Sequence, residues 1–285
     1  MSALKRGVEA ALLIGLALVL IAIPVFGVRL AVIPAIDHLF NLDQAQQSFI
    51  RRILMIFAFV GGYWVFVRLA EKRRVSEISF QPVTIGVSGI LGAAAIAVPM
   101  VGLYVSGVLS VSGFGSSSAW AMIALVIFAA ALLEEILFRA LLFRIVFEKF
   151  GFWIALILPS VLFSVLHLFN DHWAGWYGIA SGVLLGAMWS LVYVLTQNVW
   201  AAAANHAMWN FTIFASGLPL TGQADWRASA PLQSDYVGAD LWTGGASGPE
   251  ESIIVIVWLF CIVVTLVWLC LKRNLHLKYD TSAEI

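Results

Sequence analysis

Three ionisable side chains stand within one apolar stretch of the chain and are the first candidates for chemistry. Glu134, Glu135 and Arg139 interrupt a run that is apolar from Trp120 to Leu133 and again after Arg139. A charged side chain within a membrane-spanning helix costs at least ~2.5–3.5 kcal/mol on insertion scales, and such residues usually serve a function. We therefore treat this stretch as the centre of a candidate site.

Helical spacing assigns different roles to the two adjacent glutamates. Glu135 and Arg139 are four residues apart, with the glutamate on the N-terminal side, which is the favoured order for an ion pair on one helix face. Glu134 points about 100° away from Glu135 and has no such partner on its own helix. We expect a structural pair, Glu135 with Arg139, beside an unpaired Glu134 that is free to act as a general base.

Two later apolar stretches carry further pairs at one-turn spacing. Phe163 and His167 form one pair, and His206 and Asn210 form the other. A carboxylate, two imidazoles and an amide that converge in a dry cavity could supply a base, a partner imidazole and donors for an oxyanion, which is the set needed for hydrolysis. The alternative is that these side chains only join helices. His172, in a predicted turn, is a minor further candidate.

Composition places these stretches in a membrane. Of the 285 residues, 62% are hydrophobic and only 11% are charged, whereas a soluble domain is nearly half apolar and about a quarter charged. The formal net charge is zero, so no basic surface suggests nucleic acid as a partner. The lipid bilayer is the expected surrounding.

A helix needs roughly 20 apolar residues to cross the bilayer. On that basis we predict an all-α, polytopic transmembrane helix bundle of about eight spans, forming a single integral membrane domain over residues 1–285 with a motif core at about 120–215. The first apolar run is too long for a signal-peptide core and has no clear cleavage site, so we expect an uncleaved helix. The predicted spans are 8–26, 53–70, 83–108, 120–145, 152–170, 174–196, 199–216 and 252–271.

The distribution of Lys and Arg predicts the orientation. Most basic residues fall on one side of an eight-span chain, which the positive-inside rule assigns to the cytoplasm together with both termini. The polar segment 217–251 is then extracytoplasmic, and it either caps the bundle, contacts a substrate, or simply rests Trp226 and Trp242 at the interface. A second, shorter Gly/Ser-rich loop is expected over residues 110–118.

Two geometric expectations concern the fifth and sixth spans. At 1.5 Å rise per residue, His167 would lie deeper than Glu134 and His206 if its helix began at Phe152. We therefore expect that helix to begin later, with residues 146–153 in the interface; the alternative is a tilt or a kink around Pro159. In the sixth span, Gly178, Gly182 and Gly186 leave one helix face bare, which predicts close helix packing.

The ordered motifs resemble a known family. Glu134-Glu135-x-x-x-Arg139, Phe163-x-x-x-His167 and His206-x-x-x-Asn210 are similar to the three motifs of the CAAX-protease and bacteriocin-processing (CPBP, or Abi) family of intramembrane proteases. The resemblance implies an all-helical membrane fold with a cavity open to one side of the bilayer. It also implies a peptidase in which Glu134 activates water with His167 while His206 and Asn210 stabilise the oxyanion, supported by Glu135, Arg139 and Phe163.

The resemblance leaves the chemistry and the role open at three points. A glutamate-dependent reaction without metal or other cofactor is favoured, but Glu134, His167 and His206 could also form a zinc set, although no His-Glu-x-x-His helix is present. A transporter or proton relay and a non-catalytic scaffold or immunity protein are the alternative functions. The expected partner is a membrane-associated peptide or protein substrate, and the expected location is a bacterial inner membrane.

Overall fold

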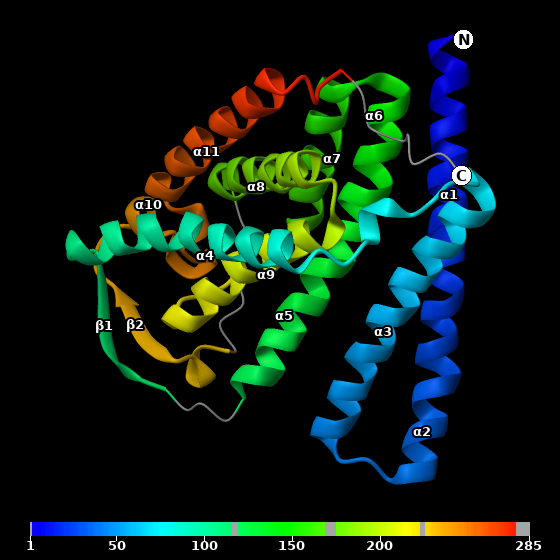
Figure 1. Ribbon diagram of the computed structural model, residues 1–285. Coiled ribbons are helices and arrows are strands. Elements are labelled where there is room, and N and C mark those ends of the chain that lie inside the picture. The colour runs from blue at the N-terminus through cyan, green and yellow to red at the C-terminus, as the bar shows by residue number, and fades with distance from the viewer. Residues whose placement is uncertain (1, 116–118, 169–174, 223–225, 278–285) are drawn as a thin grey trace.

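A computed structural model describes residues 2–115, 119–168, 175–222 and 226–277, and nearly all of its regular structure is helical. The elements, shown in Figure 1, are α1 (Ala3–Gly27), η1 (Val28–Val32), α2 (Ile33–Phe40), α3 (Gln44–Phe66), η2 (Val67–Glu71), η3 (Ser76–Ile78), α4 (Pro82–Val105), β1 (Leu109–Phe114), α5 (Trp120–Glu135), η4 (Ile136–Phe143), α6 (Arg144–Phe150), α7 (Phe152–His167), α8 (Gly175–Thr196), α9 (Val199–Ser216), η5 (Arg227–Ser229), β2 (Leu232–Tyr236), α10 (Asp240–Thr243), η6 (Gly245–Ser247), η7 (Pro249–Glu251) and α11 (Ile253–Lys272).

Each predicted span corresponds to a helix, which confirms the all-α, polytopic bundle. Within the described residues, six helical segments are long and apolar enough to cross a membrane. Of the other two predicted spans, α7 is a shorter apolar helix of 16 residues and α9 carries several buried polar side chains. The chain is therefore an integral membrane protein. The polar side chains of α9 are buried inside the helix bundle.

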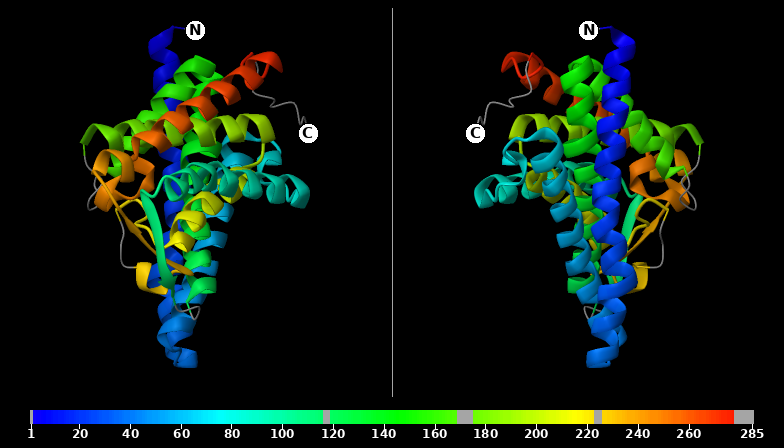
Figure 2. Two further views of the ribbon diagram at one scale, coloured as in Figure 1. Left: turned by 90° about the vertical axis from the view of Figure 1, so that its left-hand side faces the viewer. Right: turned by 90° about the vertical axis from the view of Figure 1, so that its right-hand side faces the viewer.

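The helices do not all run in one direction. The segment from α1 through η1 to α2 is 38 residues long and packs against α3 along one side of the molecule (Figures 1 and 2). In both figures α4 and α8 lie across these two helices at a steep angle. Depth in the bilayer therefore cannot be counted along each helix as if all helices were parallel.

The expectation of a late start for the fifth helix is wrong. The helix that contains the two glutamates continues through the π-helix η4 and through α6 to Phe150, so residues 144–150 belong to it. Gly151, at φ 85°, turns the chain, and α7 begins directly at Phe152. The prediction failed because it counted depth as if all helices were parallel, whereas His167 and Glu134 line one cavity although α7 begins at Phe152.

The predicted close packing on the sixth span is confirmed at two of its glycines. A Cβ atom added to Gly182 would lie 2.7 Å from Ser164 Oγ, and one added to Gly186 would lie 2.8 Å from Ser160 Cα. These distances are too short for any side chain larger than hydrogen. Bare backbone on α8 therefore lets α7 approach closely, which fixes the position of the helix that ends at His167.

The first residues of the predicted loop 110–118 belong to the strand β1 instead, and residues 116–118 lie outside the described part of the chain. β1 pairs antiparallel with β2, with Leu109 opposite Tyr236 and Phe114 opposite Leu232. The two strands are more than a hundred residues apart in sequence, so the local Gly/Ser-rich composition gave no sign of the partner. The ribbon fastens the long segment 217–251 to the bundle.

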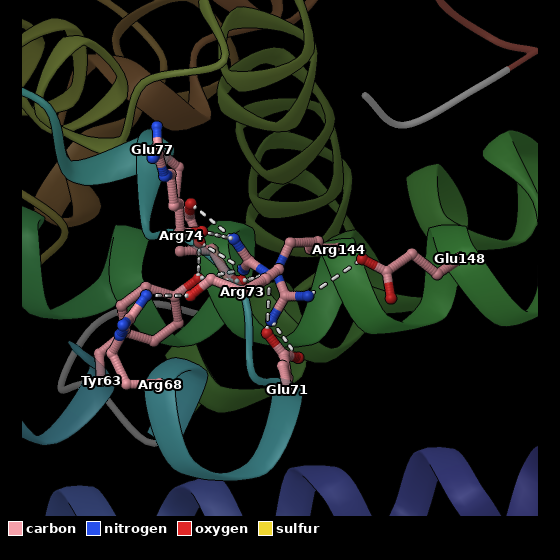
Figure 3. Close-up of polar contacts among 9 residues, drawn as sticks. Tyr63, Arg68, Glu71, Arg73, Arg74, Glu77, Arg144 and Glu148 are labelled. Atoms are coloured by element: carbon pink, nitrogen blue, oxygen red, sulfur yellow. Dashed lines mark hydrogen bonds and ion pairs between the residues drawn. The ribbon is translucent and has the colours of Figure 1, made fainter. Parts of the chain in front are cut away.

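A buried charge network supports the helical segment that carries Glu134 and Glu135, through contacts with the Ala140 carbonyl and with Arg144 (Figure 3). The Tyr63 hydroxyl donates to the Ala140 carbonyl at 3.0 Å and also contacts Glu77, and Arg144 Nε donates to the same carbonyl at 2.9 Å. Arg73 binds Glu77 through both guanidinium nitrogens, at 2.6 and 2.9 Å. Although burial raises the pKa of Glu77, the hydrogen bonds and charge of Arg73 outweigh it and hold that pKa below its ordinary value.

Candidate active site

Glu135 and Arg139 form the ion pair that their spacing predicts. Arg139 donates to Glu135 Oε1 at 2.9 Å, and both side chains are fully enclosed, at 1% and 0% exposure. The other end of the guanidinium donates to the Gly186 carbonyl at 3.0 Å, and its centre lies 4.9 Å from the Phe163 ring centroid. Arg139 thus joins η4, which continues the helix of the two glutamates, to α7 and α8.

Glu135 also holds an imidazole, a contact that the helical spacing did not reveal. His206 Nδ1 lies 2.9 Å from Glu135 Oε1. Because the same Oε1 atom also accepts from Arg139, we assign the hydrogen of this contact to Nδ1. The His206 ring is stacked on Trp189, with ring centroids 3.5 Å apart and planes 18° from parallel. One carboxylate and one indole therefore fix both the position and the tautomer of His206.

Glu134 faces the other nitrogen of the same imidazole. Its Oε2 lies 3.9 Å from His206 Nε2, and the side chain is 34% exposed, whereas Glu135 is fully buried. Within the described residues Glu134 Oε2 has no hydrogen-bond partner. The separation is too long for a direct hydrogen bond and suits a bridging water. The two glutamates therefore flank His206 from opposite sides.

His167 is oriented by its own helix. Its Nδ1 lies 2.8 Å from the Phe163 carbonyl oxygen, and because a carbonyl can only accept, Nδ1 carries the hydrogen. Nε2 is left as the acceptor nitrogen of the neutral ring. Phe163 lies 4.3 Å from the His167 ring and 6.3 Å from the His206 ring, measured between centroids. The phenylalanine of the motif therefore packs between the two imidazoles.

These side chains surround a cavity of about 110 Å³. All four residues predicted as catalytic line it, together with Phe163, whereas Glu135 and Arg139 do not reach it and support its wall from behind. His172 lies outside the described residues. The cavity is lined by Ile127, Ala130, Glu134, Phe163, His167, Leu185, Trp189, His206, Asn210, Leu220, Thr221, Trp226 and Glu250.

Three polar or aromatic lining residues, Trp189, Trp226 and Glu250, were not predicted from the sequence to belong to the site. Trp189 lies about one turn after Gly186 on α8, so helical spacing could have predicted that it shares the packed face of that helix. Trp226 and Glu250 come from the segment 217–251, which the sequence left open between a cap and a surface loop. They place this segment over the cavity as its outer wall, and nothing in their local sequence predicted that.

Glu250 is the second carboxylate of the cavity wall and is held by neutral donors. It is 1% exposed, and its two oxygens accept from Trp209 Nε1 at 2.9 Å and from Thr221 Oγ1 at 3.0 Å. Burial raises the pKa of Glu250, and the hydrogen bonds from Trp209 and Thr221 offset part of that rise. Trp209 lies in α9, between His206 and Asn210 in sequence. Its hydrogen bond to Glu250 therefore also joins the segment 217–251 to α9.

The geometry gives the zinc alternative no support. Within the part of the chain that the structure describes, no three His, Cys, Asp or Glu side chains are grouped as metal ligands would be. His206 and His167 direct their Nδ1 atoms to Glu135 and to the Phe163 carbonyl. Their Nε2 atoms and Glu134 line a shared cavity without converging on one point as a zinc ion would require.

Comparison with known proteins agrees with this geometry. Residues 116–212 match the family described as type II CAAX prenyl endopeptidase Rce1-like. The putative membrane peptidase YdiL of Bacillus subtilis is 29% identical over 79 residues, which are 28% of this chain and 30% of that protein. No solved structure matches the chain. Residues 116–212 are therefore similar to the Rce1-like CAAX endopeptidase family, as the three motifs predicted.

Proposed function

We propose that this protein is an intramembrane endopeptidase that hydrolyses a peptide bond of a membrane-associated protein or peptide. The observation that supports it most is that Glu134, His167, His206 and Asn210, from three helices, line one cavity, within the segment that matches an endopeptidase family. A carboxylate with an unpartnered oxygen beside two oriented imidazoles is the arrangement that water activation requires.

In the first step Glu134 accepts a proton from a water molecule. The water lies between Glu134 and the acceptor Nε2 of His167, and its oxygen attacks the carbonyl carbon of the scissile bond. The bond that forms is C–O, and the electron pair of the carbonyl moves to its oxygen. His167 orients the water because its other nitrogen is fixed on the Phe163 carbonyl.

His206 and Asn210 then stabilise the oxyanion. The Asn210 amide can donate directly. His206 already donates from Nδ1 to Glu135, so it donates to the oxyanion only with a second hydrogen on Nε2. It takes this hydrogen from solvent before the substrate binds and keeps it to the end, so the proton moved by Glu134 is unaffected. The positive charge of that form is balanced by Glu135 on one side and Glu134 on the other. Glu135 therefore does more than pair with Arg139, because it supports the donor form of His206.

Collapse of the tetrahedral intermediate completes the reaction. The oxyanion electron pair reforms the carbonyl, the C–N bond breaks, and the leaving nitrogen takes the proton that Glu134 holds. One water is consumed, and a carboxylic acid and an amine are released; the acid proton then passes to the amine, which leaves a carboxylate and an ammonium group. The reaction as proposed needs no metal, since the base, the orienting imidazole and the oxyanion donors are all side chains of this chain.

The position of the outer wall bears on where the substrate meets the site. The N-terminus, α6 and the end of α11 lie at one end of the molecule, away from the β1–β2 ribbon (Figure 1). If the positive-inside rule holds, this end and both termini are cytoplasmic. The cavity, covered by the segment 217–251, then receives its substrate from the opposite side of a bacterial inner membrane.

A comparison of membrane proteomes tests the proposal. Cells that express the wild-type protein are compared with cells that express Glu134→Gln at equal level, and cleaved and uncleaved membrane peptides are identified by mass spectrometry. We expect at least one peptide to accumulate uncleaved in the variant and its two fragments to appear in the wild type. Identical peptide sets in both strains, with equal amounts of folded protein, would speak against proteolysis.

A further inference from the structure

Glu250 is the lining carboxylate that the proposed hydrolysis does not use. It reaches the cavity from η7 in the outer segment, opposite the three motif helices that carry the reacting groups. Glu250 is only 1% exposed, whereas most glutamates lie at the solvent-exposed surface of a protein. A group buried at this cost in the wall of a reaction cavity calls for a role.

Among the described residues no Lys or Arg pairs with Glu250, and the titratable group that interacts with its charge is the His167 imidazole across the same cavity. The ion pairs of those residues do not include it, and its two hydrogen-bond donors, Trp209 and Thr221, are neutral. Each carboxylate oxygen can accept more than one hydrogen bond. Accepting capacity therefore remains on a group that a positive charge would stabilise.

The cavity itself offers no fixed cation. Among the residues that the structure describes, its lining contains no Lys or Arg. Arg139 is sealed behind the wall by Glu135 and the Gly186 carbonyl, and any charge on His206 is shared between Glu134 and Glu135. The charges that face the empty space are thus carboxylates, and in a low-dielectric cleft such a set attracts a cation.

The remaining walls suit the same ligand. Trp226 lines the cavity from the outer segment, and the face of an indole ring attracts ammonium and guanidinium groups. Trp189 and Phe163 add apolar wall, since they already pack against His206, His167 and Arg139. A lysine or arginine side chain also has an apolar stem that can lie along such walls while its charged end reaches a carboxylate. A neutral side chain could contact the aromatic walls, but it would leave the Glu250 carboxylate without a partner of opposite charge.

We propose that Glu250 determines substrate specificity by binding a positively charged group of the peptide next to the scissile bond. The inference rests on the proposed peptidase function and adds the class of substrate, a membrane-associated peptide with a basic residue or a free amine at the cleavage site. Glu250 binds this group, while the chemical steps remain with Glu134 and the two histidines.

The first test measures binding, so it does not depend on hydrolysis. The full chain in detergent is titrated with hexylammonium and, separately, with hexanol, by isothermal calorimetry. We expect the wild type to bind the cation at least tenfold more tightly than the alcohol, and Glu250→Gln to lose this preference. The control Asp240→Asn, which changes an exposed carboxylate of the same segment, should keep it. Equal affinities in the wild type, or a preference that survives in Glu250→Gln, would overturn the assignment.

The second test uses peptides that differ only in charge. A membrane peptide library with lysine at each position in turn is compared with the same library carrying norleucine. We expect the wild type to cleave preferentially beside lysine, and Glu250→Gln to cleave both libraries at similar rates. Cleavage without regard to charge would reject the role of Glu250 while leaving the peptidase proposal intact. Absence of any cleavage would count against the peptidase, and the titration would still decide on Glu250.

Discussion

Replacement of Arg139 by alanine should destabilise the protein strongly, because it removes a buried cation and leaves its partner. Arg139 and Glu135 are 1% and 0% exposed and 2.9 Å apart, so water cannot replace the lost contact. Removing one member of a buried ion pair costs about 3–5 kcal/mol. The hydrogen bond to Gly186 and the ring contacts with Phe163 and Trp189 are lost as well. We expect the midpoint of thermal unfolding to fall by roughly 10 °C.

The assay is thermal unfolding of purified protein in one detergent, with two comparison variants. Arg29→Ala removes an exposed arginine from the first long helix and should leave the midpoint unchanged. Glu135→Gln combined with Arg139→Met removes both charges, keeps a polar partner for His206, and should recover much of the lost stability. A midpoint for Arg139→Ala within 1 °C or so of the Arg29→Ala value would refute the buried-pair reasoning.

Three further outcomes are expected. Trp189→Leu should lower kcat about tenfold or more with little change in KM, because the ring stacked on His206 is lost while the cavity stays open; steady-state kinetics on an identified substrate checks this. The depressed pKa of Glu77 contributes stability that is present above about pH 4.3 and is lost as pH falls through the folded value, so Glu77→Gln should be less stable at pH 7 and show a flatter acid unfolding profile. Exhaustive chelation should leave peptidase activity intact, and its restoration by stoichiometric zinc after loss would contradict the proposed chemistry.

Local spacing in the sequence predicted the groups that lie within one turn of each other. Glu135 and Arg139 meet as expected, and the four residues predicted to carry the chemistry, Glu134, His167, His206 and Asn210, do line a common cavity. The ion pair could be predicted because a helix fixes which of its own side chains share a face, whatever surrounds it, whereas the catalytic roles of the four cavity residues stay a prediction. The long apolar runs likewise predicted the helical membrane fold.

The contacts between distant segments could not be predicted in the same way. The bond from Glu135 to His206 joins residues 71 positions apart, and the strands β1 and β2 lie further apart still. The position of Glu250 depends on how the segment 217–251 folds back over the bundle, which no local pattern encodes. The depth argument for His167 failed for the same reason, since helix tilt is decided by packing between helices.

The most direct test of the central claim is the hydrolysis rate of Glu134→Gln. A substrate identified from the membrane proteomes is reconstituted in vesicles with wild-type protein or with the variant, and fragment release is followed by mass spectrometry. The proposal predicts that the rate falls by roughly 10²–10⁴-fold or more while helicity and the unfolding midpoint stay at wild-type values. A folded Glu134→Gln protein that cleaves at more than a tenth or so of the wild-type rate would contradict it.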